Sequence, residues 1–320
     1  MKVMGKRNLF IKNNLAVFLM IFVSMFIFCG CGQVSQSNKN HEVTVIYTND
    51  VHTHIDNNKG DDQSNKNKLS YASVAALKKD LEKEGKNVIL VDAGDHSQGT
   101  VFGGKDNIKS IIEIMNSTGY QVATLGNHEF DYGVSNVFED IKQANYQYLS
   151  CNFYSVKDKK LVLPAYKIFD IGGAKVAFIG VSTPESLTKS NPTYFMDKNK
   201  NSYLYRFYGG ENGRELYESV QNTIDEISNK ADYVIGLGHL GVDVSAEPYR
   251  SEDVIKNTNG LDAFIDGHSH TSLKRMDVLD SKDNNVVLTQ TGSELDAIGV
   301  MTLSKTDNKK NIETKLIKEY

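Results

Sequence analysis

The chain places an amide, an imidazole and two carboxylates within five consecutive positions, from Asn127 to Asp131, directly after an apolar run. Similar polar groups follow four other apolar runs. Together the candidate site residues are Asp50, His52, Asp95, Asn127, His128, Asp131, His239, His268 and His270. A set of nitrogen and oxygen donors without a thiolate suits Zn²⁺, Mn²⁺ or iron, and it does not suit a cysteine-type structural zinc.

The number of candidate ligands favours two metal ions. Seven of these residues would be ligands, which is too many for one tetrahedral ion. The count therefore indicates two ions that share a bridging carboxylate. Two-metal sites hold their ions roughly 3.5 to 4 Å apart and promote in-line displacement at phosphorus. One histidine alone is more often a satisfied core or surface residue. Here five of the eight histidines lie in motifs at the ends of apolar runs. Of the others, His54 and His96 are predicted to be supporting or loop residues.

Short apolar, β-branched segments precede these polar groups. Each segment is typical of a strand buried on both faces, and each ends in Asp, Asn or His. They span 43–54, 87–99, 121–129, 232–241 and 261–270. Because ligands of α/β folds bind at the carboxyl ends of the strands, we expect one site at that edge.

Amphipathic stretches between the strands complete an α/β pattern. Apolar residues at helical spacing predict helices over 70–85, 106–119 and 215–230. Gly85 and Gly119 are typical helix-terminating residues. Further strand-like runs occupy 175–182, 285–290 and 298–304. The pattern predicts an α/β domain with layered sheets.

The motifs resemble those of the calcineurin-like metallophosphatases. They are Asp50-x-His52, Gly94-Asp95, Gly126-Asn127-His128-Glu129, Gly238-His239 and Gly267-His268-Ser269-His270, in the order and spacing of that family. The stretches TNDVHTH, GDHSQGT, TLGNHEFDYG and DGHSHT are similar to the 5′-nucleotidase branch in particular. The resemblance covers about residues 43 to 305. It implies a layered α/β/β/α sandwich with a dimetal site at the strand C-termini.

The resemblance also implies roles for individual residues. The first metal would be held by Asp50, His52, Asp95 and His270, and the second by Asp95, Asn127, His239 and His268. The last ligand of the first site varies within the family. His128 would donate a proton or hydrogen bond to the phosphoryl group, and Asp131 would orient it. The implied reaction is hydrolysis of phosphate monoesters by a hydroxide that the two metals activate. Glu129 is expected to act only as a helix N-terminal acid.

Several alternatives stay open. Nucleotidases of this branch usually carry a C-terminal domain that clamps the nucleoside, so we expect a catalytic domain over 42–320 without that clamp. The same ions could hydrolyse a phosphodiester or a sulfur-linked ester, or the chain could bind metal without catalysis and need a partner chain.

A metalloprotease motif is excluded because position 132 is Tyr, and a P-loop because Asp106 replaces the required Ser or Thr. The segment 194–214 is either a substrate wall or a solvated loop.

The N-terminus predicts export and lipid anchoring. Four cations precede an apolar run of 15 residues from Leu15 to Cys29, which fits a signal peptide and is short of the roughly 20 residues of a membrane span. The FCGC sequence resembles a bacterial lipobox in which Cys31 is acylated. We expect a lipoprotein signal peptide over 1–30, a tether over 31–41 and a place in the bacterial cell envelope, outside the cytoplasm. An uncleaved N-terminal anchor is the alternative.

Charge and cysteine content argue against nucleic-acid binding and against an internal disulfide. Without the four leader cations the chain has 32 basic and 40 acidic residues, which argues against a nucleic-acid-binding surface. A small phosphorylated substrate, in particular a nucleotide, is the expected partner besides the membrane, and nothing in the sequence indicates an oligomeric state. If Cys29 leaves and Cys31 is acylated, only Cys151 remains, so no internal disulfide can form. Cys151 is predicted to be a buried small hydrophobe.

Overall fold

The computed structural model describes residues 42–55, 69–100, 108–197, 199, 201–307 and 309–320. These residues belong to one compact unit, His41–Tyr320. The predicted signal peptide, the tether and Cys31 lie outside the described residues. Among the helices of the described residues, none is long and apolar enough to cross a membrane.

The first sheet has six strands in the order β17-β16-β1-β2-β3-β4. Their bounds are β1 Val43–Thr48, β2 Asn87–Asp92, β3 Val122–Thr124, β4 Gln147–Leu149, β16 Ile298–Thr306 and β17 Lys309–Ile317. Strands β1 to β4 are parallel, and β16 is antiparallel to both β1 and β17. The first three end earlier than the predicted segments, so the polar residues that follow them lie in loops.

The second sheet also has six strands, in the order β14-β15-β13-β12-β8-β7. Their bounds are β7 Tyr166–Ile171, β8 Ala174–Ser182, β12 Tyr233–His239, β13 Ala263–Ile265, β14 Ser272–Leu279 and β15 Asn285–Thr291. The four central strands are parallel, whereas the edge strands β7 and β14 are antiparallel to their neighbours. The chain therefore builds two similar parallel cores in succession.

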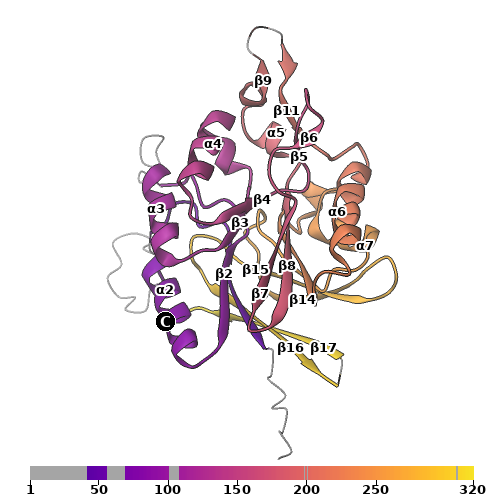
Figure 1. Cartoon of the computed structure of the whole chain (residues 1–320). Helices are drawn as coiled ribbons and strands as arrows, with labels where there is room; N and C mark the ends of the chain where they lie inside the picture. Colours follow the sequence, from indigo (N-terminus) through magenta and orange to yellow (C-terminus); the bar gives the residue numbers. More distant parts are fainter. Residues whose placement is uncertain (1–41, 56–68, 101–107, 198, 200, 308) are drawn as a thin grey trace, which may run out of the picture. The chain divides into compact units, whose positions relative to one another are not determined.

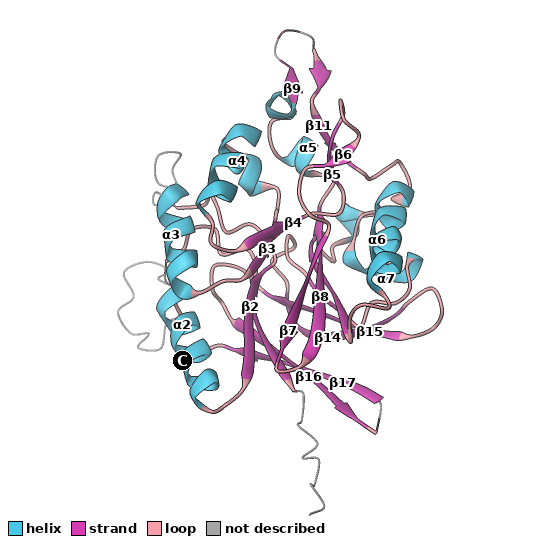
Figure 2. Cartoon of the chain, in the orientation of Figure 1, coloured by secondary structure: helices cyan, strands magenta, loops and turns pink. Residues whose placement is uncertain are grey.

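Three apolar clusters separate four layers. Helices α2 (Tyr71–Lys83), α3 (Ile108–Thr118) and α4 (Val134–Gln143) cover the first sheet, and α6 (Arg214–Ile227) and α7 (Ser251–Asn257) cover the second (Figure 1). Figure 2 shows the strands between these two groups of helices. The middle cluster packs residues such as Val45 and Ile89 of the first sheet against Phe178 and Ile235 of the second. This arrangement confirms the predicted α/β/β/α sandwich.

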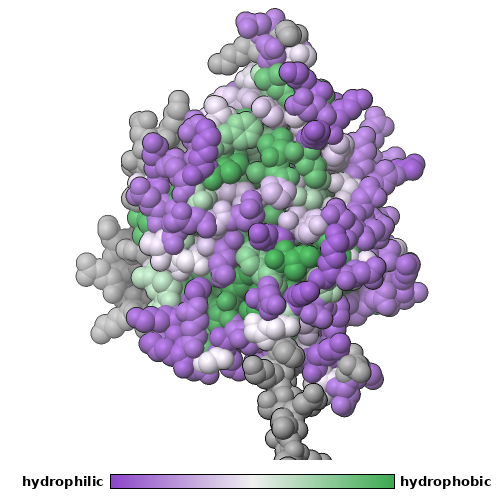
Figure 3. All heavy atoms as spheres, in the orientation of Figure 1, coloured by the Kyte–Doolittle hydropathy of each residue, from purple (hydrophilic) through white to green (hydrophobic). Residues whose placement is uncertain are grey.

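The helices follow from their sequence. Ser70 caps α2 by accepting the backbone N–H of Ser73, and the apolar face of that helix is buried through Val74 and Leu77. On the face shown in Figure 3, hydrophilic residues cover the flanks, where the helices lie, and apolar residues gather between them. Helices α4 and α7 are short and were not predicted. The seven residues of α7 are too few for a periodic pattern, but α4 carries apolar residues at Val134, Val137, Phe138 and Ile141, so its helical spacing was present in the sequence and was missed.

Small elements stand beyond the strand C-termini. They comprise the three-stranded sheet of β5 (Phe153–Ser155), β6 (Lys160–Leu161) and β11 (Tyr205–Phe207), the pair β9 (Met196–Asp197) and β10 (Ser202–Tyr203), and helices η2 (His128–Phe130), α5 (Ser186–Lys189), η3 (Pro192–Phe195) and η4 (Val244–Ala246). The described residues of 194–214 thus form short strands and a 3-10 helix and are not simply a solvated loop. Phe195 and Phe207 of this segment are buried, and their ring centroids lie 5.0 and 5.6 Å, respectively, from the ring centroid of Phe130. Because Phe130 belongs to η2, this aromatic packing holds η2 in place.

Candidate metal centre

The loops after the strands have an unusual backbone. Five of the seven predicted ligands have a left-handed φ between 49° and 79°, although none is glycine: Asp50, His52, Asp95, His268 and His270. Such conformations cost about 1 to 3 kcal/mol each and concentrate at functional sites. The surrounding fold therefore stabilises these five residues in geometries that isolated peptides avoid.

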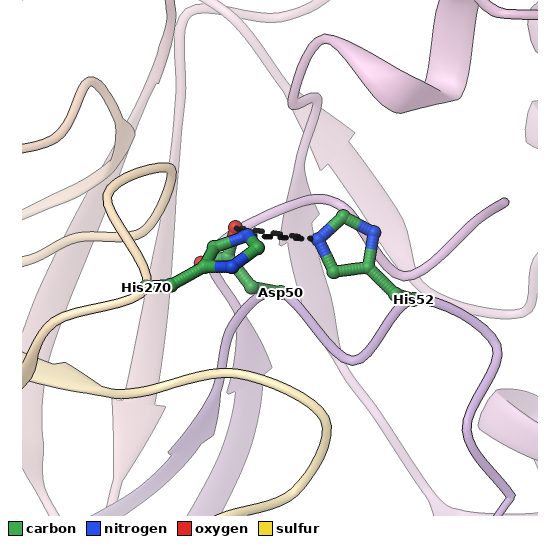
Figure 4. Close-up of side chains that lie close together, drawn as sticks. All are labelled: Asp50, His52 and His270. Atoms are coloured by element: carbon green, nitrogen blue, oxygen red, sulfur yellow. Dashed lines mark hydrogen bonds and ion pairs between the residues drawn. The ribbon is translucent and has the colours of Figure 1, made fainter. Parts of the chain in front are cut away.

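Three of the predicted ligands form a first group. Asp50, His52 and His270 each offer one ligand atom, and these atoms lie within 4.8 Å of one another. Figure 4 shows the three side chains directed toward one another. The Nε2 atoms of His52 and His270 are 3.0 Å apart, and His270 Nε2 is 3.3 Å from Asp50 Oδ1. This arrangement brings together three of the four residues assigned to the first ion.

The second group consists of Asp95, His239 and His268, whose ligand atoms again lie within 4.8 Å of one another. His239 donates from Nδ1 to the carbonyl of Ala93 at 2.8 Å, so Nε2 is the nitrogen left to bind a cation. That Nε2 lies 2.9 Å from Asp95 Oδ2. A third group joins Asp95 to His52 and His128, so Asp95 stands between the two sets.

Two buried atoms support the assignment of metal ligands. Asn127 Oδ1 is buried without a hydrogen-bond partner in the described structure, and the buried His239 Nε2 faces the carboxylate of Asp95 at 2.9 Å. A buried acceptor without a partner is costly, and a cation would satisfy both atoms. The donor set present here therefore fits two divalent ions of the Zn²⁺, Mn²⁺ or iron type.

Electrostatics keep the central carboxylate charged. Burial acts to raise the pKa of Asp95, but His239, His128 and His52 around it lower that pKa far below its usual range. Burial likewise acts to lower the pKa of His239, and the charges of Asp95 and Asp50 raise it well above its usual value. An ionised carboxylate at this position is the form that a bridging ligand requires.

His128 and Asp131 form a hydrogen-bonded pair beside this centre. His128 Nδ1 donates to Asp131 Oδ2 at 2.6 Å, and the backbone N–H of His128 donates to Asp95 Oδ1 at 2.9 Å. Burial acts to lower the pKa of His128, but its hydrogen bond to the Asp131 carboxylate and the charge of Asp95 raise that pKa to about 9. The imidazole thus carries a proton close to the predicted bridging carboxylate, in the arrangement that an acid role requires.

Residues 43–272 match the family model described as calcineurin-like phosphoesterase. The chain belongs to this family. Among curated proteins it is similar to the snake venom 5′-nucleotidase of Crotalus adamanteus, with 30% identity over 255 residues that cover 76% of this chain and 39% of the relative. The chain therefore spans about two fifths of the length of that relative.

Solved structures agree on the fold of this chain. The 5′-nucleotidase precursor from Thermus thermophilus superposes with a TM-score of 0.69 and 23% identity, covering 86% of this chain and 54% of that chain. The calcineurin-like phosphoesterase YfkN from Bacillus subtilis superposes with a TM-score of 0.66 and 24% identity, covering 87% of this chain and 90% of that chain. At these identities the likeness shows a common architecture.

Sequence reasoning missed the role of Glu129. This residue does lie in the first turn of η2, but its carboxylate accepts the backbone N–H groups of Asp95 at 2.9 Å and Gly126 at 2.7 Å through Oε2. Through Oε1 it accepts that of Ser97 at 3.0 Å. Glu129 therefore ties the loops that carry Asp95 and Asn127 together. The GNHE motif was the only available signal, and it does not reveal contacts to a loop some thirty residues earlier.

Two further residues, His96 and Gly126, support the loops of the site. His96 is buried and contacts Asp92 Oδ1 at 3.0 Å and the Tyr148 hydroxyl at 2.7 Å, so it is a supporting residue and not a member of the ligand groups. A Cβ added at Gly126 would stand 2.1 Å from Asp95 Oδ1. Only glycine lets this backbone approach the carboxylate so closely.

Replacing Glu129 with glutamine is expected to destabilise the fold by about 1 to 3 kcal/mol, because the amide N–H₂ would face backbone donors and leave at least one of them unsatisfied. Chemical denaturation of the metal-free protein measures this difference. Glu139→Gln is the matched control, since Glu139 pairs with Lys142 on the exposed face of α4, where substitutions usually change stability by less than about 0.5 kcal/mol. Equal midpoints for the two variants would refute the structural role of Glu129.

Proposed function

We propose that this chain is a dinuclear metal-dependent hydrolase of phosphate monoesters and that nucleotides are its substrates. The observation that carries the proposal is the position of Asp95. This carboxylate belongs to two groups of candidate ligands and also accepts the N–H of His128. One residue thus links the predicted metal centre to the predicted acid.

The residues assigned to each ion follow from the family resemblance and from these contacts. Bound divalent ions would supply positive charge to a phosphoryl group and lower the pKa of a coordinated water. The first ion would be held by Asp50, His52, Asp95 and His270, and the second by Asp95, Asn127, His239 and His268. The unpartnered Asn127 Oδ1, and the position of His239 Nε2 against the Asp95 carboxylate, support the second set in particular.

The His128–Asp131 pair favours catalysis over simple metal storage. Because the Nδ1–H of His128 donates a hydrogen bond to Asp131, the Nε2 of His128 is left to donate to a phosphoryl oxygen or to the leaving group. The side chain of His128 is 32% exposed, so a substrate can reach it. A protein that only binds metal would need the ligands, but not an oriented, accessible acid beside them.

The nucleotide part of the proposal is supported by relatives that are named 5′-nucleotidases. The decisive experiment uses the compact unit, residues 41–320. Metal content per chain is measured, and phosphate release from AMP is followed with and without added Mn²⁺ or Zn²⁺. Two ions per chain with metal-dependent phosphate release would support the proposal.

Two other outcomes separate the alternatives. Hydrolysis of bis-p-nitrophenyl phosphate or of a sulfur-linked ester, without hydrolysis of AMP, would identify a different ester as the substrate. Two bound ions with no hydrolysis in the whole panel would indicate a non-catalytic metal-binding protein that acts with a partner chain.

We also propose that the chain is a lipoprotein of the bacterial cell envelope with its catalytic unit outside the cytoplasm. The basic N-terminus, the apolar run and the FCGC sequence support this location. Intact-mass analysis of the protein from membranes is expected to show a mature N-terminus at Cys31 with added acyl mass. Recovery of a chain that still begins at Met1 would favour the uncleaved anchor, and Cys31→Ala should then leave membrane association unchanged.

A further inference from the structure

Glu185 contacts a predicted metal ligand, although no sequence motif contains it. Glu185 directly precedes α5, and its Oε2 lies 3.2 Å from Nε2 of His268. The side chains are 18% and 13% exposed for Glu185 and His268, so solvent competes little for this contact. The two residues are 83 positions apart in the chain, and only the fold brings them together.

This contact decides which nitrogen of His268 can bind a metal. When Nε2 carries the proton and donates it to the carboxylate, the lone pair for a cation is on Nδ1. The backbone of His268 is held separately, because its N–H lies 3.1 and 2.9 Å from the two oxygens of Asp50. Asp50 thus fixes the main chain of His268, and Glu185 fixes its ring.

The same segment supports another residue assigned to the second ion. Ser190, which follows α5, donates from Oγ to the carbonyl of Asn127 at 2.7 Å and lies 3.2 Å from Asp131 Oδ1. Both ends of the stretch 185–190 therefore contact residues assigned to the second ion or to the His128–Asp131 pair. By contrast, the first-site residue His270 is 47% exposed.

We propose that Glu185 is a positioning residue that orients His268 toward the second metal ion, and that it controls the affinity of this site selectively. The proposal rests on the metal assignment given under the proposed function. Carboxylates that accept the second N–H of a ligating histidine fix its tautomer and orientation, and their loss typically lowers metal affinity about 10- to 100-fold.

The test is a metal titration of the full chain in detergent, without substrate. Mn²⁺ or Co²⁺ is added to the metal-free protein, and the affinities of the two sites are resolved by calorimetry and, for Co²⁺, by its visible spectrum. Glu185→Ala is expected to weaken one site about 10- to 100-fold and to leave the other unchanged. Glu185→Gln retains an oxygen acceptor for the His268 N–H, so its loss should be smaller.

Glu218→Ala is the matched control, because Glu218 is an exposed carboxylate that pairs with Arg214 on α6. Unchanged affinity at both sites in Glu185→Ala, or an equal loss at both, would overturn the proposal. If melting shows that Glu185→Ala does not fold, the Glu185→Gln variant decides by the same criterion. Because binding is measured without substrate, failure to hydrolyse AMP would count against the proposed activity only.

Discussion

Replacing His128 with alanine is expected to reduce kcat about 10²- to 10⁴-fold while both metal ions stay bound. The imidazole is not among the residues assigned to either ion, but it stands beside them and is held by Asp131 at 2.6 Å. Its loss removes the proton or hydrogen bond that the transition state needs and leaves the ligands in place. Steady-state kinetics and metal analysis of the same preparation measure the two quantities.

His54→Ala provides a matched control for this substitution. His54 also lies on the loop after β1, but it is outside the described groups of candidate ligands. We expect nearly unchanged turnover for that variant. The turnover of Asp131→Asn should lie between those of His54→Ala and His128→Ala. The amide keeps the shape of the side chain but no longer carries the charge that orients His128. Full turnover in His128→Ala would remove the acid role, and loss of metal would mean that His128 is itself a ligand.

Replacing Asp95 with alanine is expected to remove bound metal as well as activity. Asp95 Oδ2 faces His239 Nε2 at 2.9 Å, and Oδ1 accepts the backbone N–H of His128 at 2.9 Å. Deletion of the carboxylate therefore removes a ligand of both predicted ions and an anchor of the His128 turn. Metal content after dialysis against metal-free buffer is expected to fall from two ions to at most one per chain.

Asp95→Asn separates the two functions of this residue. The amide oxygen can still accept the N–H of His128, so the turn should stay in place, but the negative charge that a bridge supplies is lost. We expect this variant to melt closer to the parent than Asp95→Ala does and to be deficient in metal like Asp95→Ala. An Asp95→Ala protein that retained both ions would contradict the bridging assignment.

Much of the fold was predictable because its physical causes are local. Buried parallel strands need continuous β-branched, apolar runs, and these runs are visible between 43 and 48, 87 and 92, and 233 and 239. The edge strands were harder to recognise. Strand β14 is mostly exposed, with only Val278 buried, and it pairs with β15 through a shifted register, so no continuous apolar run marks it.

The sequence by itself determined the candidate ligands, because polar residues that follow parallel strands gather at the carboxyl edge of their sheet. The packing of the two sheets then brings the two edges together, with Asp50, Asp95 and Asn127 from the first sheet and His239, His268 and His270 from the second. The sequence also determined the layered architecture, through the alternation of strand and helix periods. Only the tertiary structure decided the supporting contacts: Glu129 with the Asp95 loop, Glu185 with His268 and Ser190 with Asn127. These pairs join separate segments, and their geometry depends on how the layers pack. No spacing along the chain encodes such contacts, because the distance between two side chains of different elements is set by the packing of those elements.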